Sequence, residues 1–595
     1  MSFRHKLIGK INFGTEVNDI LRLNGIENTY KFICPSEDDI EDLSVLDNLE
    51  LAASVILEEC YQDKKIGILV DCDADGYTSA SILWNYLSKS FPKTPMIPFI
   101  HSGKQHGLTD KEVFEQIKSY NLDLLIIPDA STGDVYEINE LLDNGTMVIV
   151  LDHHDIIPNK NGIENRAIIV NNQLSEKCND KSMTGVGIVY KLLQQMDILL
   201  NEHIEKQWIA DDYLDLVAIG MIADRCDLTN LQSRYLVLKG IKQLKEKKNH
   251  NMFLKHIIEK QAFVMKNDVT ITSLAYYVCP LINAMIRLGE FDQKMDMFFA
   301  MCNEDAMRMR KLRGKGEVVI PLYEDVYKNC MTLNKTQKTI TEESFDVLKT
   351  QIDDFKLDEL PVIICNSNNS FDKNFTGLIA NVVASSYKRP CLLLNPNDNM
   401  LHGSARGFNK SQIYDFKKWC KETELFSKTE GHSNAFGVSI PMENIQKLID
   451  KLARVKYDNE LIYYVYNEYD DTTINSDIIN RIHKYNHIWN NGIDEPLFYV
   501  SNICCNFNNI EIKGKKNNIL SFPYRNMMFT YMSKSSLLEL YNDIKNCGDN
   551  IRFDMICRFS YDDYNKKSQC IIEDIMFSED KNKMSNPFGC LQTIK

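Results

Sequence analysis

Acidic and histidine side chains follow three short apolar segments of the sequence. They are Asp71, Asp73 and Asp75 after residues 66–70, Asp129 after residues 122–128, and Asp152, His153 and His154 after residues 147–151. If these segments are neighbouring parallel strands, the groups meet at one edge of a sheet. Clustered carboxylates repel one another and raise each other's pKa unless a cation neutralises them. Carboxylate oxygens with an imidazole suit Mn²⁺, with Mg²⁺ as a second candidate, so the pattern predicts a divalent-metal site.

The segment DCDADG, residues 71–76, also fits the first six positions of a calcium-binding EF-hand loop. That loop needs a bidentate glutamate at its twelfth position, where this chain has Ile82, and a helix before it, where this chain has a strand-like run. The EF-hand is therefore excluded. Acidic residues also occur in ordinary solvated loops after strands, but three acidic strand ends together with a histidine pair favour the metal site.

The elements that must position these groups alternate between strand and helix patterns. Short β-branched runs at residues 66–70, 96–100, 122–128, 147–151 and 167–170 predict strands. Segments with helical periodicity, such as YTSASILWNYL and KEVFEQIKSY, lie between them. This alternation predicts an α/β fold with a parallel, doubly wound sheet, in which ligands bind at the carboxyl ends of the strands. Residues 183–302 are predicted to be helical.

The rest of the chain suggests further domains. We expect a lead-in over residues 1–50 that ends in an acidic helical stretch, the first α/β domain over 51–304, a helical connector over 305–345, a second α/β domain over 346–455, and a small antiparallel barrel or sheet over 456–595. The connector begins with the basic segment AMRMRKLRGKGE. This segment fits a solvated helix face and the lining of a nucleic-acid groove equally well.

Composition narrows the class of protein. The 595-residue chain has 68 Lys and Arg against 83 Asp and Glu, a formal charge of −15, which argues against a simple nucleic-acid coating protein and leaves a nuclease open. Its 17 cysteines include no CxxC pair, as expected for reduced thiols in a cytosolic protein. The N-terminal segment lacks the apolar region of a signal peptide, and the uncharged stretch 269–286 contains Pro280 and Asn283, which favours buried core over a membrane span. We therefore expect a soluble, cytoplasmic protein.

Four motifs in order resemble the phosphoesterase motifs of the DHH superfamily: DCDADG, PDAST, LDHHD and DLVAIGMIADRCDL. Five further segments resemble motifs of the RecJ-type single-strand DNA exonucleases: TGVGIVYKLL, CPLINAMIRLGEFD, HGSARGF, EGHSNAFGVSIP and NNGIDEPLFYV. The resemblance extends from about residue 66 to about residue 577. It implies a DHH domain, a second domain of the DHHA1 type, and a C-terminal OB-type β-barrel.

The resemblance also implies a site with two divalent cations. The matching ligand positions are Asp73, Asp75, Asp129, His153 and Asp224, with Asp129 bridging both ions. Asp71 is expected to be a further ligand or to hydrogen-bond one. His154 would contact the scissile phosphate or protonate the leaving group, and Asp152 would orient one of the two histidines.

Nucleic-acid contacts follow from the same resemblance. The implied phosphate-binding residues are Ser404, Arg406 and His432, with Arg287 as a weaker contact. Lys104 and His106 stand where the family has an arginine near the 5′-end pocket. In the tail, Lys513, Lys515, Lys516, Tyr524 and Arg525 are candidates for single-strand binding, and a solvated strand edge explains them equally well.

The match departs from the family pattern without removing a metal ligand. Cys279-Pro280-Leu281 replaces Gly-Pro-Arg, Asn374-Phe375 replaces Trp-His, and Pro128 and Ala130 flank Asp129. The departures therefore leave the expected chemistry intact and put the preference for one strand end in doubt.

The sequence as a whole predicts a metal-dependent exonuclease that degrades single-stranded DNA from the 5′ end to mononucleotides in DNA repair or recombination. Single-stranded DNA is the expected partner, with a single-strand-binding protein or a helicase as protein partners, and we expect a monomer with no membrane association. Two alternatives remain open. One is a DHH-family phosphodiesterase acting on short oligoribonucleotides or cyclic dinucleotides, and the other is an inactive replication or repair scaffold.

Overall fold

The computed structural model describes residues 3–103, 105–155, 165–201, 208–246, 251–312, 316–368, 371, 373–455, 461–533, 535–562 and 565–578. The chain divides into two compact units. The first, here called the catalytic unit, contains Tyr30–Ile340 and His487–Asp494; the second contains Met1–Thr29, Thr341–Asn486 and Glu495–Lys595. The domain boundaries predicted from sequence are not tested by this division and stay predictions.

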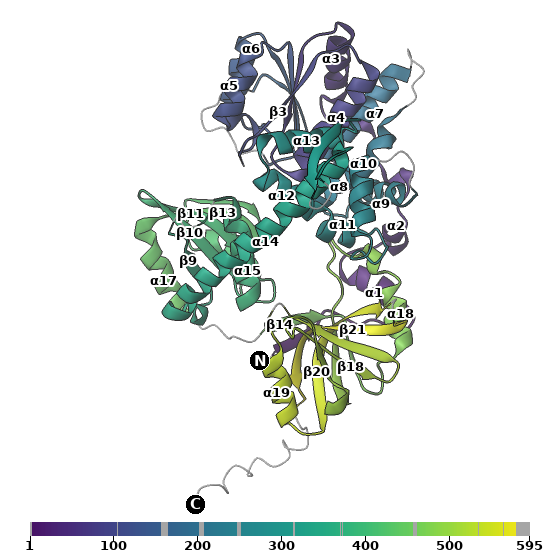
Figure 1. Ribbon diagram of the computed structural model, residues 1–595, viewed down its shortest axis with the longest axis vertical. Coiled ribbons are helices and arrows are strands. Elements are labelled where there is room, and N and C mark those ends of the chain that lie inside the picture. Colours follow the sequence, from purple (N-terminus) through teal and green to yellow (C-terminus); the bar gives the residue numbers. More distant parts are fainter. Residues whose placement is uncertain are drawn as a thin grey trace, which may run out of the picture. The chain divides into compact units, whose positions relative to one another are not determined.

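The catalytic unit is built on a five-stranded parallel sheet (Figure 1). The strand order is β3-β2-β4-β5-β6, with β2 (Ile66–Val70), β3 (Met96–Ile100), β4 (Leu124–Pro128), β5 (Met147–Asp152) and β6 (Ile168–Asn171). All four pairings are parallel. β2 and β4 are buried along their whole length, as expected for strands covered by helices on both faces. The predicted parallel α/β sheet is confirmed.

Helices cover both faces of this sheet (Figure 1). Helices α3 (Leu49–Tyr61), α4 (Ala74–Ser90) and α7 (Gly185–Asn201) share one hydrophobic cluster with Ile68 and Ile126. Helices α5 (Lys111–Ser119) and α6 (Val135–Asp143) share another with Leu69 and Ile127. The chain leaves β2 for β3 on one side and returns to β4 on the other, so the strand order reverses between β2 and β4. A crevice for ligands forms at the carboxyl ends of the strands at such a reversal.

The predicted helical region follows. It comprises α8 (Leu214–Ala223), α9 (Leu231–Glu246), α10 (Met252–Gln261), α11 (Ile271–Tyr277), α12 (Cys279–Leu288) and α13 (Phe291–Met301). The stretch Ile271–Leu288 is long and apolar enough to cross a membrane, but 56% of it is buried, and core helices of soluble proteins have the same composition. The acidic stretch at residues 37–50, predicted to be helical, instead contains two 3₁₀ turns, Glu37–Asp39 and Leu43–Val45, before α3 begins.

The prediction of a helical connector from residue 305 is wrong for its first part. Strands β7 (Met307–Leu312) and β8 (Gly316–Pro321) form an antiparallel hairpin. In MRMRKL, polar and apolar residues alternate with a period of two, which suits a strand, and the basic content hid this pattern. Arg308 forms an ion pair with Asp296 and Arg310 forms one with Asp325, each at 2.6 Å, so both guanidinium groups are paired with carboxylates of the protein. The helix α14 (Leu322–Phe355) follows and extends beyond the predicted end.

The second unit contains an α/β part with the sheet order β12-β13-β11-β10-β9. Its strands are β9 (Ile363–Asn366), β10 (Cys391–Asn397), β11 (Met400–Arg406), β12 (Lys428–His432) and β13 (Ala435–Pro441), and only the β9–β10 pairing is parallel. Its helices are α15 (Thr376–Tyr387), α16 (Phe416–Glu422) and α17 (Ile445–Arg454). Apolar side chains of β10, β11 and β13 form its core with α16 and α17.

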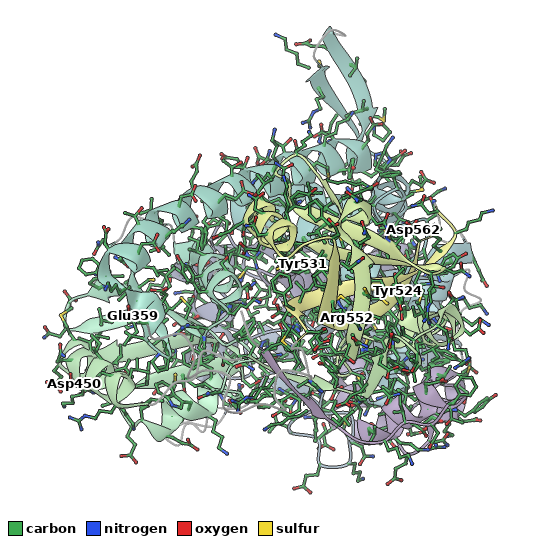
Figure 2. All side chains as sticks on the ribbon, turned by 90° about the horizontal axis from the view of Figure 1, so that it is seen from below. Glu359, Asp450, Tyr524, Tyr531, Arg552 and Asp562 are labelled. Atoms are coloured by element: carbon green, nitrogen blue, oxygen red, sulfur yellow. The ribbon has the colours of Figure 1, made fainter. Side chains whose placement is uncertain are left out.

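The same unit contains a seven-stranded sheet near the C-terminus, in the order β15-β16-β20-β21-β19-β18-β17. The strands are β15 (Asn467–Asp470), β16 (Phe498–Asn506), β17 (Glu511–Lys513), β18 (Ile519–Tyr524), β19 (Met527–Met532), β20 (Asn550–Asp562) and β21 (Lys567–Phe577), with helices α18 (Ser476–His483) and α19 (Leu538–Asn546). Figure 2 shows Tyr524, Tyr531 and Arg552 on this sheet.

This C-terminal sheet differs from the predicted antiparallel barrel in two ways. The pairings β15–β16 and β19–β21 are parallel. Among the described residues, no pairing between the outer strands β15 and β17 closes a barrel.

The N-terminal strand β1 (Phe3–Leu7) pairs in parallel with β14 (Leu461–Val465) in this unit, and the short helices α1 (Glu16–Leu23) and α2 (Thr29–Ile33) follow it in the chain.

Candidate metal centre

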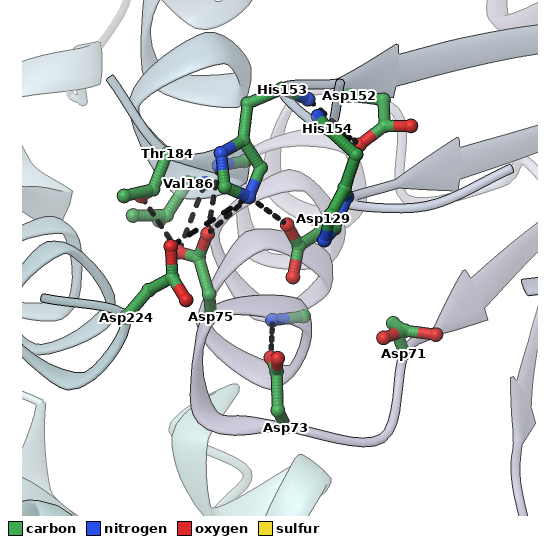
Figure 3. Close-up of polar contacts among 12 residues, drawn as sticks. Asp71, Asp73, Asp75, Asp129, Asp152, His153, His154, Thr184, Val186 and Asp224 are labelled. Carbon is green, nitrogen blue, oxygen red and sulfur yellow. Dashed lines mark hydrogen bonds and ion pairs between the residues drawn. The ribbon is translucent and has the colours of Figure 1, made fainter. Parts of the chain in front are cut away.

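The acidic residues that follow β2, β4 and β5 lie together in the catalytic unit (Figure 3). Donor atoms within 4.8 Å of one another form four groups of three among the described residues, and two of these contain all six predicted ligands: Asp75, His153 and Asp224 in one, and Asp71, Asp73 and Asp129 in the other. The remaining two groups are Asp129, His153 and His154, and Asp71, Cys72 and His106. The imidazole of His153 lies beside carboxylates of both ligand groups. Its Nε2 is 3.2 Å from Asp129 Oδ1, 3.9 Å from Asp75 Oδ2 and 3.8 Å from Asp224 Oδ2. The structure thus brings all six predicted ligands into two adjoining donor groups.

Asp129 is the residue whose surroundings point most strongly to a cation. Its side chain is buried, and among the described residues neither carboxylate oxygen accepts a hydrogen bond of normal geometry, while His153 Nε2 lies 3.2 Å from Oδ1. Its backbone is left-handed, with φ of 66°, a conformation that costs free energy for a non-glycine residue and is often found in functional sites. A buried carboxylate with no donor is costly in free energy. A divalent cation removes that cost, so the donor set of oxygens and one imidazole fits such an ion.

The start of α7 holds Asp75 in place. The Asp75 carboxylate accepts hydrogen bonds from Thr184 Oγ1 at 3.0 Å and from the backbone N–H groups of Gly185 and Val186 at 2.7 and 3.2 Å. Gly185 also leaves the space that Asp129 occupies, because a Cβ there would lie 2.4 Å from Asp129 Oδ1. Sequence reasoning gave these residues no role. The signal was the run of small residues in TGVG, where an apolar helix begins.

The carboxyl groups of the cluster are held partly protonated when no cation is bound. Burial and the charge of Asp73 raise the pKa of Asp75 to about 7. Burial and the charges of Asp75 and Asp73 raise the pKa of Asp224 to about 8. Burial and the neighbouring carboxylates raise the pKa of Asp129 well above its ordinary value. The folded protein without metal therefore binds more protons than the unfolded chain at neutral pH.

Metal affinity is expected to rise steeply with pH for this reason. The folded pKa values of Asp75 and Asp224 exceed the ordinary value of 3.8, so the metal-free protein loses stability as pH rises from about 4 to about 8. A cation must displace the same protons, and each displaced proton changes the affinity about tenfold per pH unit. We expect the dissociation constant for Mn²⁺, measured by titration calorimetry, to fall at least about tenfold between pH 6 and pH 8. A constant that does not change with pH would contradict this protonation pattern.

Asp152 organises the two histidines without facing the carboxylate cluster. Its Oδ1 accepts hydrogen bonds from the His153 backbone N–H at 2.7 Å and from His154 Nδ1 at 2.7 Å, and its Oδ2 accepts one from Thr132 Oγ1 at 2.6 Å. Although burial acts in the opposite direction, the bond and charge of His154 lower the pKa of Asp152. The bond to Asp152 in turn raises the pKa of His154 to about 9. The His154 side chain is 56% exposed, so its other nitrogen is accessible from the crevice.

Asp71 and Asp73 belong to the cluster and also accept hydrogen bonds from the surrounding protein. Asp73 caps α4 by accepting a hydrogen bond from the Gly76 N–H at 2.9 Å. Asp71 Oδ2 accepts one from His106 Nδ1 at 2.5 Å, and its Oδ1 accepts one from the Gly107 N–H at 2.9 Å. The bond to Asp71 raises the pKa of His106 to about 11. His106 therefore lies beside the acidic cluster, whereas Lys104 lies outside the described residues.

The predicted phosphate-binding residues fall into two separate sets. Arg287, on α12, lies in the catalytic unit. Burial lowers its pKa below the ordinary value, and the nearby charge of Asp73 opposes part of this shift. In the second unit, Ser404 Oγ lies 2.9 Å from Thr376 Oγ1 at the start of α15. The Arg406 guanidinium lies over Gly377, where a Cβ would come within 2.4 Å of its Nη2.

His432 ends β12, and its backbone pairs with Ala435 in the turn GHSNA. This turn is joined to the end of β11, because the Gly407 N–H donates a hydrogen bond to the Asn434 carbonyl at 2.8 Å. The motifs HGSARGF and EGHSNAFG are therefore neighbours in space. Sequence reasoning missed Thr376 and Gly377, which supply the first turn of α15 beside Ser404 and Arg406.

The comparisons with known proteins agree with this arrangement. The N-terminal domain of the DHH family matches residues 65–221, which include β2 to β6 and most of the acidic cluster. YorK of the Bacillus subtilis SPbeta prophage, provisionally named a single-strand DNA-specific exonuclease, is 32% identical over 580 residues, which cover 96% of this chain and 97% of that protein. RecJ of Haemophilus influenzae, named a single-stranded-DNA-specific exonuclease, is 26% identical and covers 76% of this chain and 77% of its own length.

The fold has a solved counterpart. The crystal structure of RecJ from Thermus thermophilus in complex with Mn²⁺ matches 97% of this chain and 80% of that chain with a TM-score of 0.71 at 19% identity. Its Mg²⁺ complex matches with a TM-score of 0.64. The chain belongs to the RecJ-like exonucleases of the DHH superfamily, which confirms the resemblance seen in the motifs.

Proposed function

We propose that this protein is a divalent-cation-dependent exonuclease that hydrolyses single-stranded DNA from the 5′ end and releases mononucleotides. The observation that carries the proposal is the position of Asp129, whose buried carboxylate adjoins two groups of donor atoms and accepts no hydrogen bond of normal geometry among the described residues. Relatives that match most of the chain are named single-strand DNA-specific exonucleases, which supports the same substrate. We further propose a role in DNA repair or recombination and a cytoplasmic location.

In this proposal, Asp75, His153 and Asp224 would hold one cation, Asp71 and Asp73 would hold the other, and Asp129 would contribute to both. When bound, such a pair supplies a nucleophilic hydroxide at neutral pH and neutralises charge on the attacked phosphate. Mn²⁺ is the preferred ion for a set that includes an imidazole, and Mg²⁺ is the second choice. Hydrogen bonds from Thr184 and Gly185 hold Asp75 in position, so this ligand is in place before an ion binds.

His154 is proposed to act on the phosphate or the leaving oxygen. Its Nδ1 is fixed by the hydrogen bond to Asp152, which leaves Nε2 on a half-exposed ring beside His153. A ring held at one nitrogen presents the other in a defined direction, as a phosphate contact or a general acid requires. Asp152 is a positioning residue in this scheme, because Thr132 and the His153 backbone hold it in turn.

Ser404, Arg406 and His432 are proposed to hold phosphates of the DNA strand in the second unit. A helix start with exposed N–H groups, a hydroxyl and a guanidinium together suit a phosphate. Arg287 and, near the 5′ end, Lys104 with His106 are proposed as further contacts. The C-terminal sheet, where the Arg525 guanidinium carbon lies 5.2 Å from the centre of the Tyr524 ring, is proposed as a further surface for the strand. A single-strand-binding protein or helicase would deliver the strand to a monomeric enzyme.

Replacing Arg406 with alanine is expected to raise KM for a long single strand by about tenfold or more, because a charge-assisted hydrogen bond contributes about 1.5–3 kcal/mol. The value of kcat should change less. Lysine at position 406 is expected to restore only part of the loss, since it lacks the planar fork of arginine. Arg454→Ala, at the exposed end of α17 in the same unit, is the matched control and should leave KM unchanged. Equal KM values for R406A and R454A would remove Arg406 from the proposed interface.

The experiment that tests the function is product analysis with Mn²⁺ on single strands labelled at the 5′ or the 3′ end. We expect the 5′ label to appear at once as a mononucleotide, while the 3′-labelled strand shortens in steps. Release of the 3′ label first would reverse the polarity. Faster cleavage of a dinucleotide than of a long strand would favour the short-oligonucleotide phosphodiesterase, and binding without cleavage under any cation would favour the scaffold.

A further inference from the structure

A short segment from late in the chain completes the catalytic unit. His487–Asp494 belongs to that unit, although the residues on either side of it in the sequence belong to the other. Ile488, Trp489 and Ile493 are buried, with 1%, 1% and 3% of their surface exposed. The fully buried Arg234 on α9 donates a hydrogen bond to the Ile488 carbonyl at 3.4 Å. The segment is therefore packed into the unit rather than lying on its surface.

This segment contacts the turn that carries Asp224. Asp224 directly follows α8, and residues 225–228 form the turn after it. The Leu228 N–H donates a hydrogen bond to the Asn491 carbonyl at 2.8 Å, and the Asn491 Nδ2 donates one to the Ile222 carbonyl at 3.5 Å. Asn491 thus links the two sides of the turn, one before Asp224 and one after it.

The backbone of the segment is strained at the point of contact. Asn490, Asn491 and Gly492 have successive φ values of 109°, 48° and 110°, and the turn is closed by the Asn490 N–H bonded to the Ile493 carbonyl at 2.8 Å. Such conformations cost free energy and persist only where the surrounding structure requires them. A Cβ on Gly492 would lie 2.1 Å from Asp227 Oδ1, which is itself held by the Thr229 N–H at 2.9 Å. The close approach of the segment to residue 227 therefore requires glycine.

Asp224 depends on this turn more than the other carboxylates do. Asp75 is fixed by three hydrogen bonds, whereas no hydrogen bond to the Asp224 carboxylate is found within the described part of the chain. Its side chain is 30% exposed, the largest value among the three aspartates around His153 Nε2. The position of its oxygens is therefore set by the backbone of residues 222–228.

We infer that Asn491 and Gly492 are positioning residues for Asp224: they hold the 222–228 turn so that its carboxylate completes the group formed with Asp75 and His153. This inference rests on the proposed metal centre. It assigns a role in metal binding to the segment NNGIDEP, which lies 267 positions beyond the ligand that it serves (491 − 224). It also means that residues 30–340 alone lack part of the scaffold of the centre.

The test is titration calorimetry of the full chain with Mn²⁺ alone, for the variants Asn491→Gly and Gly492→Ala. N491G keeps the tolerance of a left-handed backbone and removes only the side-chain bond to Ile222. The control is Gly548→Ala, which has a similar φ of +104° but no atom within 4 Å of the new Cβ. Changes in partners of metal ligands typically weaken metal affinity about 10–100-fold. We expect one of two Mn²⁺ sites to weaken at least about tenfold in G492A and N491G, while G548A keeps both.

Activity and folding measurements complete the test. In the two variants, kcat is expected to recover at high Mn²⁺ while KM for DNA stays unchanged, which a general loss of structure would not produce. Thermal unfolding without metal establishes whether the variants are folded. If G492A is not folded, the result for N491G alone tests the inference. Unchanged affinity at both sites would overturn the inference and leave the metal centre standing. Wild-type protein that binds no Mn²⁺ would instead overturn the proposed function itself.

Discussion

Replacing Asp129 with asparagine is expected to lower kcat for single-stranded DNA by about 10³-fold or more and to raise the stability of the metal-free protein. The first effect follows because Asp129 adjoins both donor groups, and metal-based charge stabilisation contributes several kcal/mol at about 1.4 kcal/mol per tenfold in rate. Asparagine suits this position because it tolerates the left-handed φ of 66°. The loss is thus due to charge and ligand chemistry rather than to backbone strain.

The second effect is a gain in the stability of the metal-free protein. The Asp129 carboxyl is buried among other carboxylates and accepts no hydrogen bond of normal geometry from the described residues, so ionising it in the metal-free protein is unfavourable. Removing that charge should raise the unfolding free energy at pH 8 by about 1–3 kcal/mol, a shift of a few degrees in Tm. Addition of Mn²⁺ should raise the Tm of the wild type and leave that of the variant nearly unchanged. Scanning calorimetry with and without Mn²⁺ measures both.

Asp215→Asn provides the matched control. Asp215 is equally buried in the catalytic unit, and its pKa is likewise raised, to about 6, mainly by burial. Its carboxylate is paired, however, with the N–H groups of Asn251 and Leu216 at 2.8 and 2.7 Å. The substitution should lower the Tm and leave the kcat of folded protein intact. If D129N retained wild-type turnover, or if D215N lost it equally, Asp129 would have no special place in the chemistry.

Local sequence patterns were sufficient to predict the parallel sheet. β2, β3 and β5 begin at the predicted residues, because each is a short apolar run that is ended by polar residues. The acidic groups could be predicted to converge for the same reason, since they directly follow strands whose carboxyl ends share an edge. The places of His153 and Asp129 in the cluster could therefore be predicted without information on distant contacts.

The sequence was less informative where position depends on distant partners. Gly185 and Thr184 act on Asp75 and Asp129 across the start of α7, and a glycine in a helix pattern does not reveal which side chain occupies the space it leaves. Asn491 acts on a turn far away in the chain, a contact that no local pattern encodes. The hairpin β7–β8 was missed because its charges suggested a helix face, and the C-terminal strands were recognised while their parallel pairings were not. Pairing direction depends on connections across the sheet rather than on periodicity.

Replacing Gly185 with alanine is expected to lower kcat by about 10²-fold, although the change adds a single methyl group. The new Cβ would lie 2.4 Å from Asp129 Oδ1 and 2.6 Å from Asp129 Cβ, so the carboxylate or the start of α7 must move. A displacement of about 1 Å in a catalytic group can cost about 10²-fold in rate. Because the Gly185 N–H also binds Asp75 at 2.7 Å, both donor groups are disturbed, and Mn²⁺ affinity should fall with kcat.

The control for this substitution is Gly133→Ala, in the loop that follows β4. A Cβ at Gly133 meets nothing within 4 Å, and its φ is not in the left-handed region. Steady-state kinetics over a range of Mn²⁺ concentrations should show wild-type behaviour for G133A and a reduced kcat for G185A at every concentration. Full recovery of G185A at high Mn²⁺ would mean that only affinity had changed. Wild-type kinetics for G185A would show that Asp129 can move without loss, and the rigid placement of its carboxylate would then have no part in catalysis.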